Sequence, residues 1–155
     1  MQKEKHEIIT HQTDFINFVQ QLKNYNDQEL RKPIEEDKWS VIEIIAHFFP
    51  WDEFIMQQRL PYFFKETTFP PGPNADEVNY EAALLARSNT IQSTIDKCLL
   101  VRRELVQILT TLPEEKWFVE MKINQSPLTI YSYFKGLMEH DLHHIEQIKQ
   151  SLQIK

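Results

Sequence analysis

Residues 129–152 read TIYSYFKGLMEHDLHHIEQIKQSL, and apolar side chains recur in this stretch every three or four positions. On a helical wheel of about 100° per residue with Phe134 at zero, seven other apolar positions fall within about 60° on either side. These positions are Ile130, Tyr131, Leu137, Met138, Ile145, Ile148 and Leu152. The pattern predicts an amphipathic helix over about 129–151 with one face in a core.

Three segments upstream show the same helical periodicity, at about residues 3–25, 40–64 and 78–111. In the second of them, Ser40 is followed three residues later by Glu43, which is the pattern of a capping box. Four long amphipathic helices predict an all-α fold, a four-helix bundle.

The connections between these segments are short enough for one domain that spans residues 1–155. The clearest loop reads FPPGPN at 69–74, and residues 113–127 could hold a short hairpin or coil. Aromatic residues crowd the loop at 61–74, where they could line a pocket or pack against the end of the bundle. Packing against the bundle is the expectation.

Composition excludes several classes of protein. Only two glycines occur, so the chain holds neither a Walker loop nor a dinucleotide-binding fingerprint. The single cysteine, Cys98, excludes an internal disulfide and is expected to be a small buried hydrophobe. A net charge of −6 argues against a nucleic-acid partner, and no apolar run suits a membrane span or a signal peptide. We expect a cytoplasmic protein that takes a small-molecule substrate.

Three histidines lie close together near the end of the last helix. On the same wheel, His144 falls at about −80° and His140 at about −120°, on one shoulder of the apolar stripe, whereas His143 falls at about 180° and faces solvent. Two imidazoles spaced i and i+4 can bind one metal ion. His140 and His144 are therefore a candidate pair of ligands, although such a pair also arises by chance on a surface.

A third histidine, His47, lies on a shoulder of the second helix, at about −60° from Ile44. Pro50 follows it and should kink that helix, which either is a tolerated bend or opens room beside the histidine. His47, His140 and His144 together would form a three-histidine site with positions left open for water or substrate. Alone, His47 would be a hydrogen-bonded boundary residue. The remaining histidines, His6 and His11, are expected to be solvated.

Two stretches resemble the motifs of the DinB/YfiT superfamily. WSVIEIIAH at 39–47, followed by Trp51 and Asp52, resembles the first motif, and EHDLHHIEQI at 139–148 resembles the last-helix motif. Two differences from the common pattern, Pro50 and the Ile145-Glu146 pair, touch no proposed ligand but could reshape the pocket.

The resemblance implies a bundle of up-down-down-up type, usually a homodimer. It implies a divalent metal, such as zinc or nickel, held by His47, His140 and His144. Known relatives include transferases and an isomerase that use a low-molecular-weight thiol, as well as proteins described as metal-dependent hydrolases. Fold alone does not decide between these reactions.

A divalent metal with three neutral ligands can activate water or a thiol near neutral pH, and such chemistry usually needs a proton-handling partner. Asp141 falls at about −20°, inside the apolar stripe, so it must be paired and could orient a ligand histidine. Glu43 lies one turn before His47 and could accept a hydrogen bond from its ring, or could simply cap the helix. Asp52 lies nearer the polar side and is the weaker candidate.

Three functional hypotheses follow. The first is a metal-dependent enzyme that acts on a small electrophile by thiol transfer or by hydrolysis. The second is a non-catalytic bundle that binds a metal or small ligand under stress. The third is a homodimeric interaction protein with incidental histidines.

Overall fold

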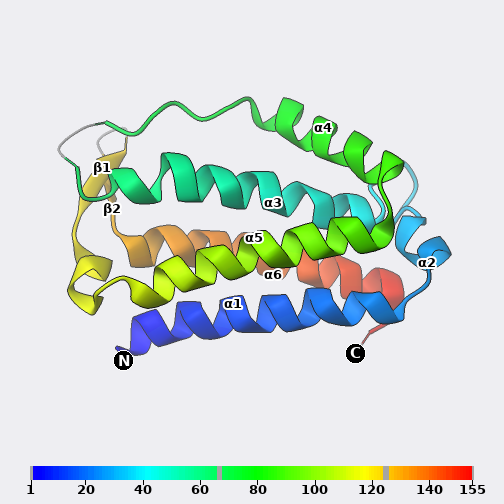
Figure 1. Cartoon of the computed structure of the whole chain (residues 1–155), viewed down its shortest axis with the longest axis horizontal. Helices are drawn as coiled ribbons and strands as arrows, with labels where there is room; N and C mark the ends of the chain where they lie inside the picture. The colour runs from blue at the N-terminus through cyan, green and yellow to red at the C-terminus, as the bar shows by residue number, and fades with distance from the viewer. Residues whose placement is uncertain (1, 66–67, 124–125, 155) are drawn as a thin grey trace.

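The computed structural model describes residues 2–65, 68–123 and 126–154. Four long helices form its body: α1 (Lys3–Gln21), α3 (Val41–Gln58), α5 (Ile91–Thr111) and α6 (Ile130–Leu152) (Figure 1). The predicted all-α four-helix bundle is therefore confirmed. Among the described residues, no helix is long and apolar enough to cross a membrane.

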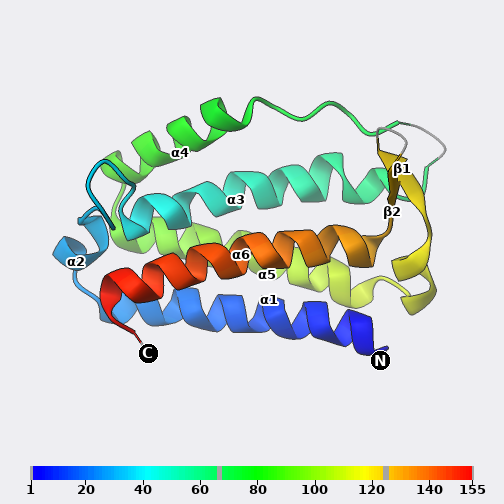
Figure 2. The same ribbon diagram turned by 180° about the vertical axis from the view of Figure 1, so that it is seen from behind.

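The order and direction of the helices follow the up-down-down-up arrangement. In Figures 1 and 2, α1 and α6 run in one direction along the long axis, and α3 and α5 run in the other. Helix α3 packs against α5, and α1 packs against both α5 and α6. Because α3 and α5 are parallel neighbours, the chain must return along the whole bundle between them.

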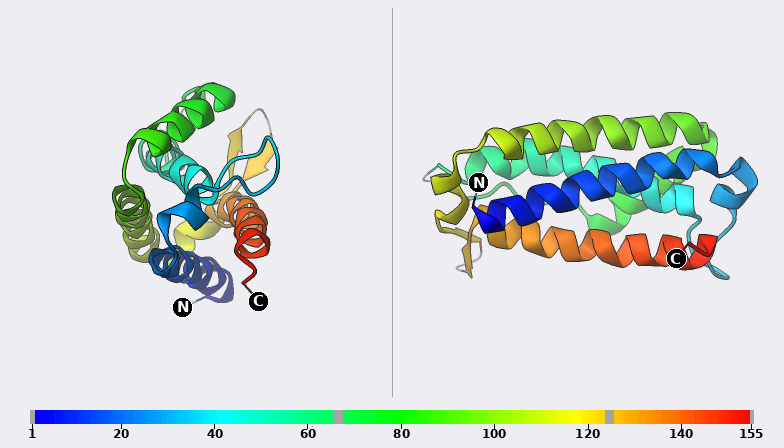
Figure 3. Two further views of the ribbon diagram at one scale, coloured as in Figure 1. Left: turned by 90° about the vertical axis from the view of Figure 1, so that its right-hand side faces the viewer. Right: turned by 90° about the horizontal axis from the view of Figure 1, so that it is seen from below.

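That return includes a separate helix, so the prediction of one helix over 78–111 was wrong. The segment forms α4 (Ala75–Ser88) and α5, with the break at Asn89 and Thr90. The Thr90 hydroxyl accepts a hydrogen bond from the Ser93 N–H and caps the new helix. Helix α4 lies outside the four-helix body, against α3 (Figure 3).

The other segments differ from prediction mainly at their ends. After α1 come the short helices η1 (Leu22–Asn24) and α2 (Asp27–Arg31), and after α3 comes η2 (Leu60–Tyr62). Helix α3 continues through Pro50, and its first turn has the predicted capping box of Ser40 and Glu43.

The connection before α6 holds a hairpin, one of the two forms that the sequence left open. Its elements are η3 (Glu114–Phe118), β1 (Met121–Ile123) and β2 (Ser126–Leu128), and the strands pair antiparallel, Met121 opposite Leu128. The loop after α3 packs against the bundle, as expected: Phe63 is fully buried and Phe69 is partly buried beside it.

The interior consists of two apolar clusters, one toward each end of the bundle. The first contains Phe15, Phe48, Leu99 and Ile148, and the second contains Ile8, Ile55, Leu105, Trp117 and Phe134. Cys98 belongs to the first, and burial raises the pKa of its thiol to about 12, so the thiol stays protonated and packs as a hydrophobe.

Buried polar side chains separate the two clusters. Each long helix contributes to this polar layer between its members of the first and second clusters: Gln12 from α1, Asp52 from α3, Arg102 from α5 and Asp141 from α6. All four are at most 4% exposed. The layer fixes the positions of the four helices relative to one another along the bundle axis, because each buried polar group must lie beside its partner.

Candidate metal centre

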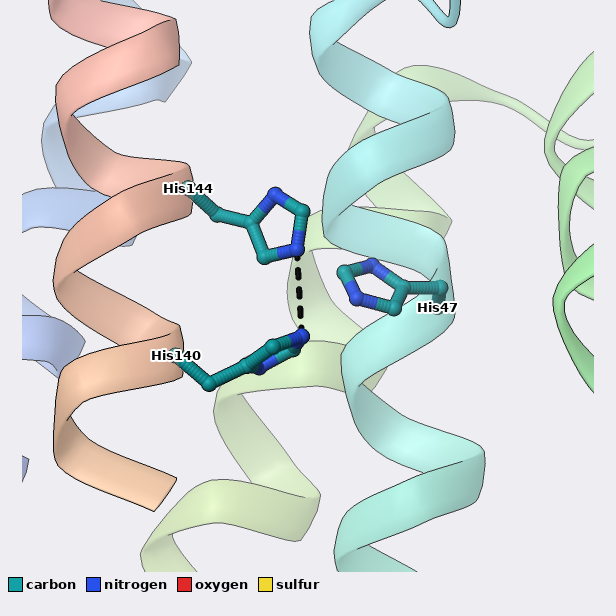
Figure 4. A group of neighbouring side chains, drawn as sticks. All are labelled: His47, His140 and His144. Atoms are coloured by element: carbon teal, nitrogen blue, oxygen red, sulfur yellow. Dashed lines mark hydrogen bonds between the residues drawn. The ribbon is translucent and has the colours of Figure 1, made fainter. Parts of the chain in front are cut away.

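Three histidines from two helices converge at the boundary between α3 and α6. His47 projects from α3 toward His140 and His144, which project from consecutive turns of α6 (Figure 4). One ring nitrogen from each lies within 4.8 Å of the others, so the three form a candidate ligand set. The sequence predicted these three residues, and the structure brings them together.

The distance between the two α6 histidines suits a shared ion. The Nε2 atoms of His140 and His144 are 3.2 Å apart. Two nitrogens that bind one zinc ion at about 2.0–2.1 Å in tetrahedral geometry lie about 3.3 Å from each other. The donor atoms are therefore already spaced for a metal.

Hydrogen bonds also orient two of the rings. His47 Nδ1 contacts the carbonyl of Ile44, and His144 Nδ1 lies 2.8 Å from the side-chain oxygen of Gln147. Since both oxygens only accept, each Nδ1 carries the proton and each Nε2 keeps a free lone pair. A metal-binding histidine uses its second nitrogen in this way to hold the ring in place.

The surroundings keep the rings neutral. Burial lowers the pKa of His47 to about 4 and lowers the pKa of both His140 and His144 below the ordinary value. His47 is 3% exposed and packs beside Trp39 and Phe48. Neutral imidazole is the form that binds a metal, so the site is ready at neutral pH.

The remaining histidines lie elsewhere. His143 is exposed and outside the ligand set, as the wheel predicts. His6 is exposed and contacts Thr10. The expectation for His11 was wrong: it is 7% exposed, and its Nε2 lies 2.8 Å from Asp141. Although the sequence of α1 is mostly polar, one face of the helix packs into the interior, and both His11 and Gln12 lie on that face.

Arg102 connects the two helices that carry the histidines. Its Nε is 2.7 Å from Asp52 on α3, and its Nη1 is 2.8 Å from Asp141 on α6 and 2.9 Å from the Gln12 side chain. The guanidinium also lies 3.7 Å from the Phe15 ring centroid. Despite its burial, the two carboxylates raise the pKa of Arg102, so it stays charged.

The two carboxylates of this group have different protonation behaviour. Burial raises the pKa of Asp52 to about 6, against the opposing effect of Arg102. Burial would also raise the pKa of Asp141, but Arg102 and the His11 hydrogen bond lower it to about 2. The sequence placed Asp52 toward the polar side; its burial shows that a charged residue can turn inward when a buried arginine pairs with it.

Neither expected hydrogen bond from a ligand histidine to a carboxylate forms among the described contacts. Glu43 caps α3 through Ser40 and forms an ion pair with Arg87 of α4 at 2.8 Å. The His47 ring donates instead to the carbonyl of Ile44. Asp141 is buried in the apolar stripe as predicted, but its partners are Arg102 and His11. These partners come from α5 and α1, which the wheel of a single helix does not show.

A cavity of about 480 Å³ adjoins the histidines. His47 and His140 lie at its wall, and the polar residues Asp52, Arg102 and Asp141 also face it. Most of the remaining wall is aromatic or aliphatic, which is typical of small-molecule sites of this size. His144 borders a second, smaller cavity of about 230 Å³ beside Trp39.

Comparisons with known proteins agree with this arrangement. The structure resembles that of YfiT from Bacillus subtilis, described as a probable metal-dependent hydrolase with an unusual four-helix bundle topology. The TM-score is 0.77 at 16% sequence identity, over 99% of this chain and 89% of YfiT. No sequence among the curated proteins matches the chain. The family model of the DinB superfamily matches residues 10–148, and because this match covers most of the chain, the protein belongs to the DinB superfamily.

Proposed function

We propose that this protein is a metal-dependent enzyme that acts on a small electrophilic substrate, either by hydrolysis or by transfer to a low-molecular-weight thiol. The observation that carries the proposal is the convergence of three histidine nitrogens, with two of the residues, His47 and His140, at the wall of a ligand-sized cavity. Membership of the DinB superfamily and the description of YfiT as a probable metal-dependent hydrolase support it.

The three imidazoles would hold one divalent ion and leave further coordination positions open, which is the pattern of catalytic rather than structural sites. When bound, such an ion supplies Lewis-acid activation of a nucleophile at neutral pH. His47 and His144 present their Nε2 lone pairs to that position because Ile44 and Gln147 hold the opposite ring nitrogens.

Other cavity residues have supporting roles. Part of the cavity wall beside the histidines is apolar and limits the access of water to a bound substrate; it is formed by Phe48, Phe134 and Leu137. Arg102 holds Asp52 and Asp141 in fixed positions, so these carboxylates keep the two histidine-bearing helices in register. We assign neither Glu43 nor Asp141 a proton-transfer role, because each is held in an ion pair and, among the described contacts, neither accepts a hydrogen bond from a ligand histidine.

Metal analysis followed by activity measurements tests the proposal. Purified protein should bind about one zinc or nickel ion per chain, and the loaded protein should turn over an activated ester or a haloarene. Omitting the added thiol separates the two routes, since only hydrolysis proceeds without it. His47→Ala should strongly weaken metal binding and turnover, whereas His143→Ala, a change at an exposed histidine of α6, should affect neither.

Two results would argue against an enzyme. Stoichiometric metal without turnover of any electrophile, with or without thiol, would favour a non-catalytic metal- or ligand-binding bundle. Absence of metal binding would leave the histidines incidental and favour an interaction protein.

A further inference from the structure

The cavity beside the histidines extends far from them along two helices. Along α3 its wall runs from His47 to Arg59, the residue that follows the helix, and on α6 it runs from His140 back to Tyr133. Twelve residues of α-helix span about 18 Å and seven span about 10 Å. The cavity is therefore elongated, with the histidine cluster near one end and Arg59 near the other.

Arg59 differs from the other arginine of this cavity in its partners. Its Nη1 donates to two backbone carbonyls, of Pro70 at 2.7 Å and Gln58 at 2.9 Å. Its guanidinium lies 4.5 Å from the ring centroid of Phe54 and 5.4 Å from that of Phe69. These contacts hold the group in place without neutralising its charge.

Among the described residues, no carboxylate pairs with Arg59, whereas Arg102 pairs with both Asp52 and Asp141. Arg59 is therefore a positive charge at the wall of a mostly apolar cavity, oriented by carbonyls and aromatic rings. A guanidinium in such a place is suited to bind an anionic group of a ligand, because its planar set of donors matches the two oxygens of a carboxylate.

We propose that the cavity binds an elongated small molecule whose reactive end lies at the three histidines and whose carboxylate, at the opposite end, pairs with Arg59. This inference rests on the proposed function, because the histidine site defines the reactive end. A carboxylate is favoured over a phosphate because Arg59 is the one cation at this end of the cavity among the described residues, and a doubly charged group would remain only half neutralised.

Neighbouring residues fit such a ligand. Tyr133 lies at the same end, and burial raises its pKa to about 12, so its hydroxyl keeps the proton and can donate to an anion beside Arg59. Between the two ends the wall includes Trp51, whose indole N–H is held by Asn79 at 2.8 Å, and Leu137. The middle of the ligand should accordingly be apolar or aromatic.

Calorimetric titration with ω-mercaptoalkanoates of increasing chain length tests the inference. Each acid is compared with the ω-mercaptoalkanol of the same length, which has the same thiol and chain but no charge. On the zinc-loaded protein, the longer acids should bind about tenfold or more tightly than their alcohols, as expected for a hydrogen-bonded charge pair, and the shortest acids should show no such advantage.

Arg59→Met removes the charge while keeping a chain that can pack on Phe54 and Phe69, and it should abolish the advantage of the acid. Arg59→Lys should retain part of it, and circular dichroism should confirm that both variants fold. Arg103→Met is the matched control, since Arg103 is exposed and lies outside the cavity wall, and it should change nothing.

Equal binding of long acids and alcohols, or an acid advantage that survives in Arg59→Met, would overturn the carboxylate subsite. Failure of the metal site is distinguishable from this result. If the protein binds no zinc, ω-phenylalkanoates and the matching alcohols are compared on the metal-free protein, where an Arg59-dependent preference for the acid supports the subsite and equal binding refutes it.

Discussion

At the scale of single residues, His143 and His144 are chain neighbours with different surroundings. His144 faces His140 and His47, whereas His143 lies on the exposed side of α6. We predict that His47→Ala, His140→Ala and His144→Ala each weaken zinc binding at least about 100-fold, since losing even an outer partner of a ligand costs about 10–100-fold. His143→Ala should leave affinity unchanged. The zinc affinity of each variant is measured by competition with a chromophoric chelator.

A different pattern would revise the ligand set. If His143→Ala removed zinc as effectively as His144→Ala, the pair spaced i and i+3 would be the ligands, and the assignment from the wheel and from the ring positions would be wrong.

The burial of the histidines sets the pH dependence of metal binding. Burial lowers the pKa of His47 from 6.5 to about 4 and lowers those of His140 and His144 in the same direction. Protons compete with a metal only below the pKa of each ligand, so zinc affinity should be level above about pH 6.5. It should decline below that, and most steeply as pH approaches 4, where His47 also takes a proton.

Binding isotherms recorded at half-unit steps between pH 8 and pH 4 provide the measurement. Affinity that already falls steeply between pH 7 and pH 6, where imidazoles with the ordinary pKa of about 6.5 take up protons, would mean that the rings are solvated and unperturbed. Affinity that stays constant down to pH 4 would exclude a site made of histidines alone.

At the scale of helices, Arg102 and its partners determine how α3 and α6 meet. Arg102→Met would leave Asp52 and Asp141 buried without their cation, and removing one partner of a buried ion pair costs about 3–5 kcal/mol. We predict a loss of this size in the free energy of unfolding by urea. The triple variant Arg102→Met, Asp52→Asn, Asp141→Asn should recover most of it, because no unpaired charge remains.

Zinc affinity distinguishes a positioning role of this group from a purely stabilising one. His47 and Asp52 share α3, and His140 and Asp141 share α6, so the pairs with Arg102 set the offset between the ligands. The triple variant should therefore recover stability but remain about tenfold or more weaker in zinc binding. Full recovery of both stability and zinc affinity would show that apolar packing alone positions the histidines.

Much of this site was predictable from sequence because helical periodicity places residues on a face. The same wheel that put His140 and His144 on one shoulder put Asp141 inside the apolar stripe, and the structure agrees with both positions. The wheel could not identify the partners of Asp141, because His11 and Arg102 lie on other helices, more than thirty residues away in the chain.

The break at Asn89 and Thr90 was missed for a different reason. No proline or glycine marks it, and the apolar periodicity resumes at Ile91. The available signal was Thr90, whose hydroxyl caps the N-terminus of α5. In the structure, Arg31 of α2 also supports the break, because it donates to the carbonyls of Ala86 and Asn89. A cap of this kind is weak evidence in a sequence and becomes decisive only when tertiary contacts support it.

At the scale of the whole molecule, the metal site lies beside a core that does not depend on it. The two apolar clusters draw on all four long helices and include fully buried Phe15, Trp117 and Phe134. Each fully buried large apolar side chain contributes about 1.5–3 kcal/mol before the loss of conformational entropy is counted. Small domains that need zinc to fold lack such a core.

We therefore predict that the metal is dispensable for folding. Chelator-treated protein should keep its helical circular-dichroism spectrum and melt cooperatively, because His140 is exposed and His144 is only partly buried. A ligand at 100 times its Kd stabilises the native state by about 2.7 kcal/mol. For a domain of this size each kcal/mol shifts the Tm by about 2–4 °C, so saturating zinc should raise it by about 5–11 °C. A metal-free chain that is unfolded at room temperature would instead show that the metal is structural, and the proposal of an open catalytic site would lose its main support.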